Sequence, residues 1–433
     1  MLKRAALVCL FGSLTLLVVG GLSLGYRHMQ KLSGEGAVSA PDAPAAYGDE
    51  ASDRLSRFTV DLTYTSLDVP DSGEVMSQVT WDDAWFTADE TVYNHDLAHT
   101  ASVLAALAYS ESGYYQAGSN QPAYMENALS KLGFSDISTE SYQYRSEVVD
   151  EILNVVTDDA DSIAYTVARR HLITSDGSKR DLIVVSARGS YGSEWLSNLN
   201  VAECSSNDHG GYCRAAQEIC EEVATWTAES KADGADVSLL LVGHSRGGAV
   251  ANLAAADIAD LRAGDSDHDL PQALSQVDHA YTYTFASPAT TVSSQAHAER
   301  YASIYNIINP SDIMPFLPLQ TWGYVRYGTD LELPGTGDGG FVALYARMQE
   351  SYRQATGVEC SYDPADKETV QAVLSSLGSG VTSIDELVTP KGAVSVFLAV
   401  AAHVDPVRIL YSHYPTTYIA WLDVLEPEQL KGL

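Results

Sequence analysis

The stretch LLLVGHSRGG, residues 239–248, joins an apolar run to a serine that has glycines on either side. The segment DVSLLLVG, residues 236–243, is short and apolar, which favours a strand buried inside a parallel sheet. The segment GGAVANLAAADIADL, residues 247–261, is rich in alanine and favours a helix. A strand, a tight turn and a helix are therefore expected here, with Ser245 at the turn.

Ser245 is the central residue of the pentapeptide Gly243-His244-Ser245-Arg246-Gly247, which has the form G-x-S-x-G. Between a buried strand and a helix, this pattern indicates a nucleophile elbow, a strained turn that presents the serine hydroxyl. Glycines suit it because side chains on either side of the serine would collide with the turn. A serine that only caps the helix is the alternative. The pattern predicts Ser245 as a catalytic nucleophile.

A serine hydroxyl needs a base, and an elbow of this type has its partners downstream in the order acid, then histidine. Asp312, in IINPSDIMPFLP, follows an apolar strand that ends at Ile308, although it could also simply form a turn. His413, in LYSHYPTTYIAWL, precedes a C-terminal helix, whereas His403 lies in an apolar, helix-like run. The prediction is a triad of Ser245, Asp312 and His413, with His403 as the reserve histidine.

A tetrahedral oxyanion needs hydrogen-bond donors that are fixed before it forms. The backbone N–H of Arg246, directly after the nucleophile, is expected to be one of them. The second donor is expected on a loop that follows an earlier strand. In LIVVSARGSYGSEW a strand ends near Ala187, Gly189 lets the chain turn, and Ser190 offers both an N–H and a hydroxyl. Ser190 and Arg246 are therefore the predicted oxyanion hole.

Strand-like and helix-like segments alternate along the middle of the chain. This alternation predicts an α/β fold with a mostly parallel central sheet flanked by helices. After residue 335 the pattern becomes mostly helical, which suggests a helical insertion at about 335–405. The strand-like segments are 161–172, 180–190, 236–243, 279–287 and 301–309, and the helix-like ones are 92–110, 210–230 and 247–261.

The bulk composition is that of a globular protein. The 433 residues are 45% hydrophobic and 19% charged, and 57 acidic against 25 basic residues give a formal charge of −32. A surface with this charge repels nucleic acid and anionic lipid headgroups. Nucleic acid is therefore not an expected partner.

The N-terminus indicates export. Lys3 and Arg4 precede the uncharged run Ala5–Leu24, which is long enough to span a bilayer's hydrocarbon core and also resembles a signal peptide. Residues 1–25 are interpreted as a signal peptide or a membrane anchor, and residues 26–56 as a flexible linker. The remainder, 57–433, is expected to be one hydrolase domain, either secreted or anchored at the cell surface.

Four cysteines follow Cys9, and an even number in an exported chain permits two disulfides. Cys204 and Cys213 flank a short polar loop and are the preferred pair. Cys220 and Cys360 would form the second pair. Free buried thiols are the alternative.

Several of these segments, in this order, resemble the motifs of the class 3, or fungal-type, lipases, a family of the α/β-hydrolase superfamily. The resemblance implies the α/β-hydrolase fold and a lid at Tyr191–Leu199. Ser287 stands where the family usually has glycine, and Arg326 where a histidine is common. The segments are ARGSYGSEW, HGGYCRAAQEI, GHSRGGA, YTYTFASPATT, NPSDIMP, GYVRYGTDLEL and SHYPTTY.

The resemblance and the triad together predict an exported serine hydrolase of carboxylic esters, a lipase or carboxylesterase that works through an acyl-enzyme. Its expected partner is an ester or lipid substrate, and no metal or cofactor is required. Transfer of the acyl group to an alcohol uses the same intermediate and stays open. A non-catalytic ester-binding module is a further alternative, although no member of the triad is missing.

A zinc site is the last alternative. NHDLAH contains His95-Asp96-x-x-His99, and two histidines four residues apart share one face of a helix. The acid is Asp rather than the Glu of zinc proteases, and no third ligand is evident. A helix that starts with exposed polar residues is the preferred interpretation.

Overall fold

The computed structural model describes the chain from Leu55 onward, with gaps. Residues 1–54, which hold the predicted export segment and most of the linker, lie outside the described residues. The same is true of Ser190, the predicted lid at 191–199, Cys204 and His403. The described residues are 55–66, 68–69, 73–117, 123–139, 141–142, 163–189, 207–265, 270–381, 383 and 406–432.

A seven-stranded sheet forms the centre of the described part, in the order β3-β4-β5-β6-β7-β8-β9. The neighbours from β5 to β9 are parallel, whereas β3, β4 and β5 pair antiparallel at one edge. This confirms the prediction of a mostly parallel sheet. The strands are β3 (Asp136–Ser138), β4 (Tyr165–Ile173), β5 (Lys179–Ala187), β6 (Asp236–His244), β7 (His279–Phe285), β8 (Ile304–Ile308) and β9 (Thr329–Glu332).

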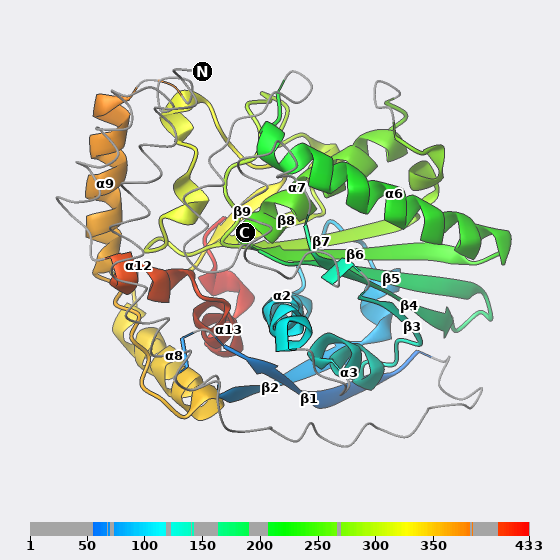
Figure 1. The fold of residues 1–433 in the computed structure, drawn as a ribbon, viewed down its shortest axis with the longest axis horizontal. Coiled ribbons are helices and arrows are strands. Elements are labelled where there is room, and N and C mark those ends of the chain that lie inside the picture. The colour runs from blue at the N-terminus through cyan, green and yellow to red at the C-terminus, as the bar shows by residue number, and fades with distance from the viewer. Residues whose placement is uncertain are drawn as a thin grey trace.

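Helices cover both faces of this sheet, as Figure 1 shows. Helices α6 (Gly210–Ala232) and α7 (Arg246–Arg262) lie on one face, and α2 (His95–Ala117) and α13 (Pro415–Val424) on the other. Each face has its own hydrophobic core, because alternate residues of β6 point to opposite sides. Leu239 and Leu241 join the α6–α7 core, whereas Leu240 and Val242 join the α2–α13 core.

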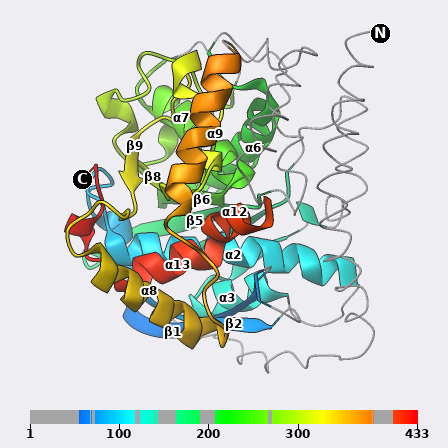
Figure 2. The same cartoon turned by 90° about the vertical axis from the view of Figure 1, so that its left-hand side faces the viewer.

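A β-hairpin forms an outer layer beyond α2. Strands β1 (Arg57–Thr65) and β2 (Glu74–Asp82) pair antiparallel, separately from the main sheet. Buried and exposed residues alternate along β2, and its buried side chains join the α2–α13 core. Helix α8 (Phe341–Thr356) lies beside this hairpin, as both views show (Figures 1 and 2). The sequence analysis did not predict the hairpin.

The chain after residue 335 is mostly helical where it is described. Helix α9 (Asp366–Gly380) presents Val370, Val373 and Leu377 to the segment that follows β8, and these side chains form a small core of their own. Helix α12 (Pro406–His413) then leads into α13. The remaining elements are the helix α3 (Tyr124–Lys131) and the short 3-10 helices Asp83–Thr87, Gln272–Gln276, Glu299–Tyr301, Met314–Phe316, Gln320–Trp322 and Pro427–Gln429.

The predicted pairing of Cys220 with Cys360 is wrong. Both are free thiols, because they lie in the cores on opposite faces of the sheet. Cys220 is buried on α6, where its Sγ lies 3.8 Å from the carbonyl oxygen of Ala254. The preferred pair, Cys204 with Cys213, falls partly outside the described residues.

No helix in the described part of the chain has both the length and the apolar character that crossing a membrane requires.

Candidate active site

Ser245 lies in a strained turn between β6 and α7. Its backbone angles are φ 57° and ψ −128°, a left-handed conformation that costs free energy for any residue other than glycine. Two backbone hydrogen bonds hold the turn. The N–H of Ser245 donates to the carbonyl of Phe285 at 2.8 Å, and its own carbonyl accepts from Ala249 at 3.1 Å. The strand-to-helix turn that the pentapeptide predicts is thus present.

The glycines of the pentapeptide are required by close backbone contacts. A Cβ on Gly243 would collide with the carbonyl of Gly247 across the turn. A Cβ on Gly247 would collide with the carbonyl of Ala187, the last residue of β5. Glycine therefore allows α7 to start directly against the end of the neighbouring strand.

Asp312 is fully buried in the loop that follows β8. Its Oδ1 accepts a hydrogen bond from the backbone N–H of Met314 at 2.9 Å. Its Oδ2 accepts from the hydroxyl of Tyr418 and lies 2.8 Å from Nδ1 of His413. A carboxylate only accepts hydrogen bonds, so Nδ1 of His413 carries the proton of that pair.

His413 is the last residue of α12, and its side chain is 12% exposed. With Nδ1 bound to Asp312, its Nε2 is the nitrogen left to act as a base. The imidazole lies against the ring of His244, the residue directly before Ser245, with ring centroids 4.8 Å apart. The structure thus brings His413 and Asp312 together beside the serine turn, although 101 residues separate them in the chain.

His244 contributes to this arrangement, and the sequence analysis did not assign it a role. Its Nε2 donates to the carbonyl oxygen of His413 at 2.7 Å, and its Nδ1 accepts from the hydroxyl of Tyr109 at 2.9 Å. Burial, together with the neighbouring His413, holds the pKa of His244 well below its ordinary value. His244 is therefore neutral and carries its proton on Nε2.

Tyr418 and Asn309 are further residues that sequence reasoning missed. The Tyr418 hydroxyl donates to Asp312 and accepts from the backbone N–H of Asn309 at 3.1 Å. The side-chain amide of Asn309 donates to the carbonyl of Ser412 at 2.9 Å, directly before His413. These bonds fasten the aspartate loop to α12 and α13. Asn309 could have been found from the family-like NPSD segment.

The predicted oxyanion residues are only partly described. Arg246 is the first residue of α7, next to Ser245, where its backbone N–H is not needed within the helix. Ser190 lies outside the described residues, but Gly189 before it is described and buried. A Cβ on Gly189 would collide with the hydroxyl of Tyr109, which explains why glycine stands there.

The two departures from the lipase motifs contact each other. Arg326 donates through Nη1 to the carbonyl oxygen of Ser287 at 3.0 Å, and its Nε donates to Oδ1 of Asp330 at 2.9 Å. Ser287 is fully buried, and Arg326 is 5% exposed. The arginine therefore fastens the end of β7 to the segment before β9.

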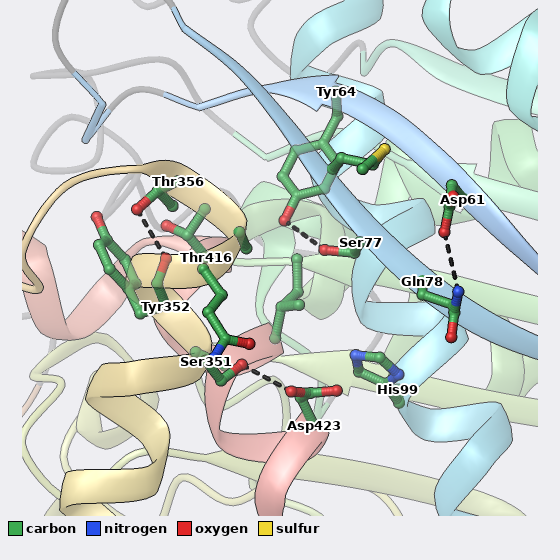
Figure 3. A pocket seen from close by; sticks show the side chains of 15 residues that line it. Asp61, Tyr64, Ser77, Gln78, His99, Ser351, Tyr352, Thr356, Thr416 and Asp423 are labelled. Atoms are coloured by element: carbon green, nitrogen blue, oxygen red, sulfur yellow. Dashed lines mark hydrogen bonds between the residues drawn. The ribbon is translucent and has the colours of Figure 1, made fainter.

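The histidines of the NHDLAH segment do not face one ligand. In His95, Nε2 lies 2.9 Å from the carbonyl oxygen of Leu422 and Nδ1 lies 3.1 Å from the hydroxyl of Tyr93. Both ring nitrogens are thus occupied by protein groups. His99 lies one turn further along α2 and faces a different part of the molecule, the cleft drawn in Figure 3.

Comparison with known proteins identifies the family that this region resembles. Residues 184–322 match the family model described as lipase (class 3). This confirms the resemblance drawn from the motifs and, with the sheet described above, the α/β-hydrolase fold. The matched region runs from β5 through the serine turn to the loop that carries Asp312.

A curated relative matches part of the chain. It is "Secreted mono- and diacylglycerol lipase 1" of Fusarium solani, 29% identical over 179 residues. The match covers 38% of this chain and 47% of that protein, so the chain spans about half the length of this relative.

Solved fungal lipases are more distant. The lipase–propeptide complex of Rhizomucor miehei is 18% identical, with a TM-score of 0.37, and the match covers 55% of this chain and 68% of that one. The lipase of Rhizopus microsporus var. chinensis is 15% identical, with a TM-score of 0.35, and the match covers 63% of this chain and 82% of that one.

Proposed function

We propose that this protein is a serine hydrolase that cleaves carboxylic esters, with Ser245 as the nucleophile. The observation that carries the proposal is the strained turn at Ser245, held beside a buried aspartate–histidine pair whose two members lie 101 residues apart in the chain. Strain of this kind is kept where it serves a function, and here it presents the hydroxyl at the end of β6.

In this mechanism His413 acts as the general base. Its Nε2 takes the proton of the Ser245 hydroxyl while the serine oxygen attacks the ester carbonyl. The resulting tetrahedral intermediate collapses to an acyl-enzyme, and His413 gives the proton to the leaving alcohol. Water, deprotonated by the same nitrogen, then releases the carboxylic acid and restores the serine.

Asp312 holds the ring of His413 and stabilises its charged form. Hydrogen bonds from the Tyr418 hydroxyl and the Met314 backbone N–H hold its carboxylate in this position. The backbone N–H of Arg246 and the N–H and hydroxyl of Ser190 are proposed to bind the oxyanion. Chemistry of this type uses only groups of the chain itself and requires no metal or cofactor.

The proposed substrates are lipid esters, with acylglycerols as the first class to test. The class 3 lipase match and the name of the curated relative support this choice. The segment that follows Asp312 packs against α9, so the helical region beyond residue 335 lies next to the loop that carries Asp312. This region is proposed to restrict which esters enter.

Export is part of the proposal. The basic start and the apolar run 5–24 support passage across a membrane, and the curated relative is named as secreted. Sequencing the N-terminus of the mature protein distinguishes the two forms. A start at Tyr26 means a cleaved signal peptide, and retention of residues 1–25 means an anchor.

The test is hydrolysis of p-nitrophenyl esters from acetate to palmitate, beside mono- and diacylglycerols, with Ser245→Ala as the control. Activity that disappears in the variant supports the proposal, and the preferred chain length separates a lipase from a short-chain esterase. Product analysis with an added alcohol identifies acyl transfer. A folded protein without activity on any ester would contradict the proposal and favour a binding module.

A further inference from the structure

A cleft of about 400 Å³ lies on the hairpin side of the molecule. Its walls come from β1, β2, α2, α8 and α13, and Figure 3 shows its side chains converging from these elements. None of the residues assigned above to the esterase mechanism lines it. Its volume lies within the roughly 300–1,000 Å³ that is usual for small-molecule sites.

His99 contributes a polar atom to this cleft that has no partner. Its Nε2 is shielded from solvent and makes no hydrogen bond within the described part of the chain. Burial lowers the pKa of His99, so the ring is neutral at pH 7. Buried polar atoms are nearly always hydrogen-bonded, so this nitrogen at the edge of the cleft is a group with which a ligand hydroxyl can pair.

The mouth of the cleft is rich in hydrogen-bond acceptors. Asp423 accepts from the hydroxyl of Ser351 at 2.7 Å, and Asp61 accepts from the amide of Gln78 at 3.2 Å. Both aspartates and Gln78 are exposed, so their remaining acceptor capacity faces solvent. No lysine or arginine is among the residues that line the cleft in the described structure. An anionic ligand is therefore disfavoured.

The side chains at the floor of the cleft are mostly buried, and most of their polar groups are hydrogen-bonded within the protein. Tyr64 and Ser77 share a hydrogen bond of 3.1 Å, and Tyr352 donates to Asp68 at 2.8 Å. The apolar side chain of Ile419 is buried beside them. A ligand here meets carbon surface at the bottom and carboxylate, amide and imidazole groups around the mouth.

We propose that this cleft binds a neutral polyhydroxylated molecule, a sugar or polyol. One ligand hydroxyl pairs with Nε2 of His99, and others donate to Asp423 and to the Asp61–Gln78 pair. Hydroxyl groups both donate and accept, which suits a neutral imidazole beside carboxylate and amide oxygens. The C–H faces of such a ligand cover the apolar floor. This site is separate from the proposed esterase site and does not depend on it.

The test is titration calorimetry on the full chain that carries Ser245→Ala, so that ester turnover cannot contribute. Glucose, sucrose and sorbitol are the neutral probes, choline is the cation, and inorganic phosphate is the anion. At least one neutral probe is expected to bind, and Gln78→Leu and His99→Leu are each expected to weaken it about tenfold. Gln272→Leu, at an exposed glutamine outside the cleft, is the matched control and is expected to bind like its parent.

Two outcomes would overturn the proposal: no neutral probe binds, whether or not choline or phosphate does, or the neutral probes bind equally well in Gln78→Leu. Melting curves establish that each variant is folded, and the exposed Gln78 keeps the test valid if His99→Leu fails to fold. Binding is measured in the Ser245→Ala chain, whereas ester hydrolysis is measured with Ser245 present. A negative result in one experiment therefore leaves the other proposal standing.

Discussion

His244 donates a hydrogen bond from Nε2 to the backbone carbonyl oxygen of His413, at 2.7 Å. The residue before the proposed nucleophile thus holds the backbone of the proposed base. Because a carbonyl only accepts, this bond sets the tautomer of His244, and the Tyr109 hydroxyl supplies the matching donor to Nδ1. The positions of the serine turn and of His413 are therefore coupled through one side chain.

His244→Phe keeps a ring beside His413 and removes both hydrogen bonds. We expect kcat for ester hydrolysis to fall about 10²-fold with little change in KM, because a misplaced base slows chemistry more than binding. Tyr109→Phe leaves the hydrogen bond from His244 to His413 in place, so its kcat should fall less. Steady-state kinetics on one soluble ester checks both, and a His244→Phe enzyme with normal kcat would contradict the coupling.

Asp312→Asn should lower kcat by about 10⁴-fold and leave the fold intact, because the amide no longer holds the correct tautomer of His413. Tyr418→Phe removes one hydrogen bond to the carboxylate, at 2.8 Å, together with the acceptor for the Asn309 N–H, and should lower kcat about tenfold. The two variants are compared by kcat and by thermal unfolding. Near-normal turnover in Asp312→Asn would mean that another residue is the third triad member.

Gly247→Ala should disrupt the serine turn. The added methyl would meet the carbonyl of Ala187 and push α7 away from β5, which we expect to cost about 1–3 kcal/mol and most of the activity. Gly337→Ala is the control, since a Cβ there meets nothing within 4 Å. Denaturant unfolding measures both. Equal stabilities would show that the close contact is not required.

Glu111 should make stability depend on pH. Burial raises the pKa of this carboxyl to about 7 from 4.5, while its Oε2 accepts from the N–H of Met125 at 3.0 Å. Since the folded pKa is above the unfolded one, the stabilising contribution is complete below about pH 4.5 and is lost as the pH rises to about 7 and above. Glu111→Gln should remove this decline. Unfolding free energies at pH 5 and pH 8 test it, and an unchanged decline in the variant would assign it to other groups.

Much of the central sheet could be predicted from the sequence. Strands β5, β6 and β8 contain apolar runs, β7 is rich in tyrosine and threonine, and α6 and α7 show helical patterns, so the local signals agreed with the fold. The hairpin was missed even though Val75, Val79 and Trp81 alternate with exposed residues along β2. That alternation is a readable strand signal, but the packing of the hairpin against α2 and α8 depends on distant parts of the chain.

The residues of the candidate site also divide into those that the sequence predicted and those that it did not. Ser245, Asp312 and His413 were selected because a motif and a chain order point to those residue types. The assignment of their roles stays a prediction, as does that of Ser190 and Arg246. His244, Tyr109 and Tyr418 were missed, because their roles depend on contacts between residues more than 100 positions apart.

The cysteine error has a related cause. Cysteine spacing does not determine connectivity, and Cys220 and Cys360 lie on opposite faces of the sheet. Only the topology of the folded chain reveals that separation.

The measurement that most directly tests the central claim is labelling with a fluorophosphonate ester, a reagent that phosphonylates activated serines. After labelling, intact-mass spectrometry and peptide mapping should find one adduct per chain, on Ser245. Ser245→Ala should remain unlabelled, and His413→Ala should react far more slowly. Labelling of Ser245→Ala at the same rate, or an adduct on another residue, would contradict the assignment of Ser245 as the nucleophile.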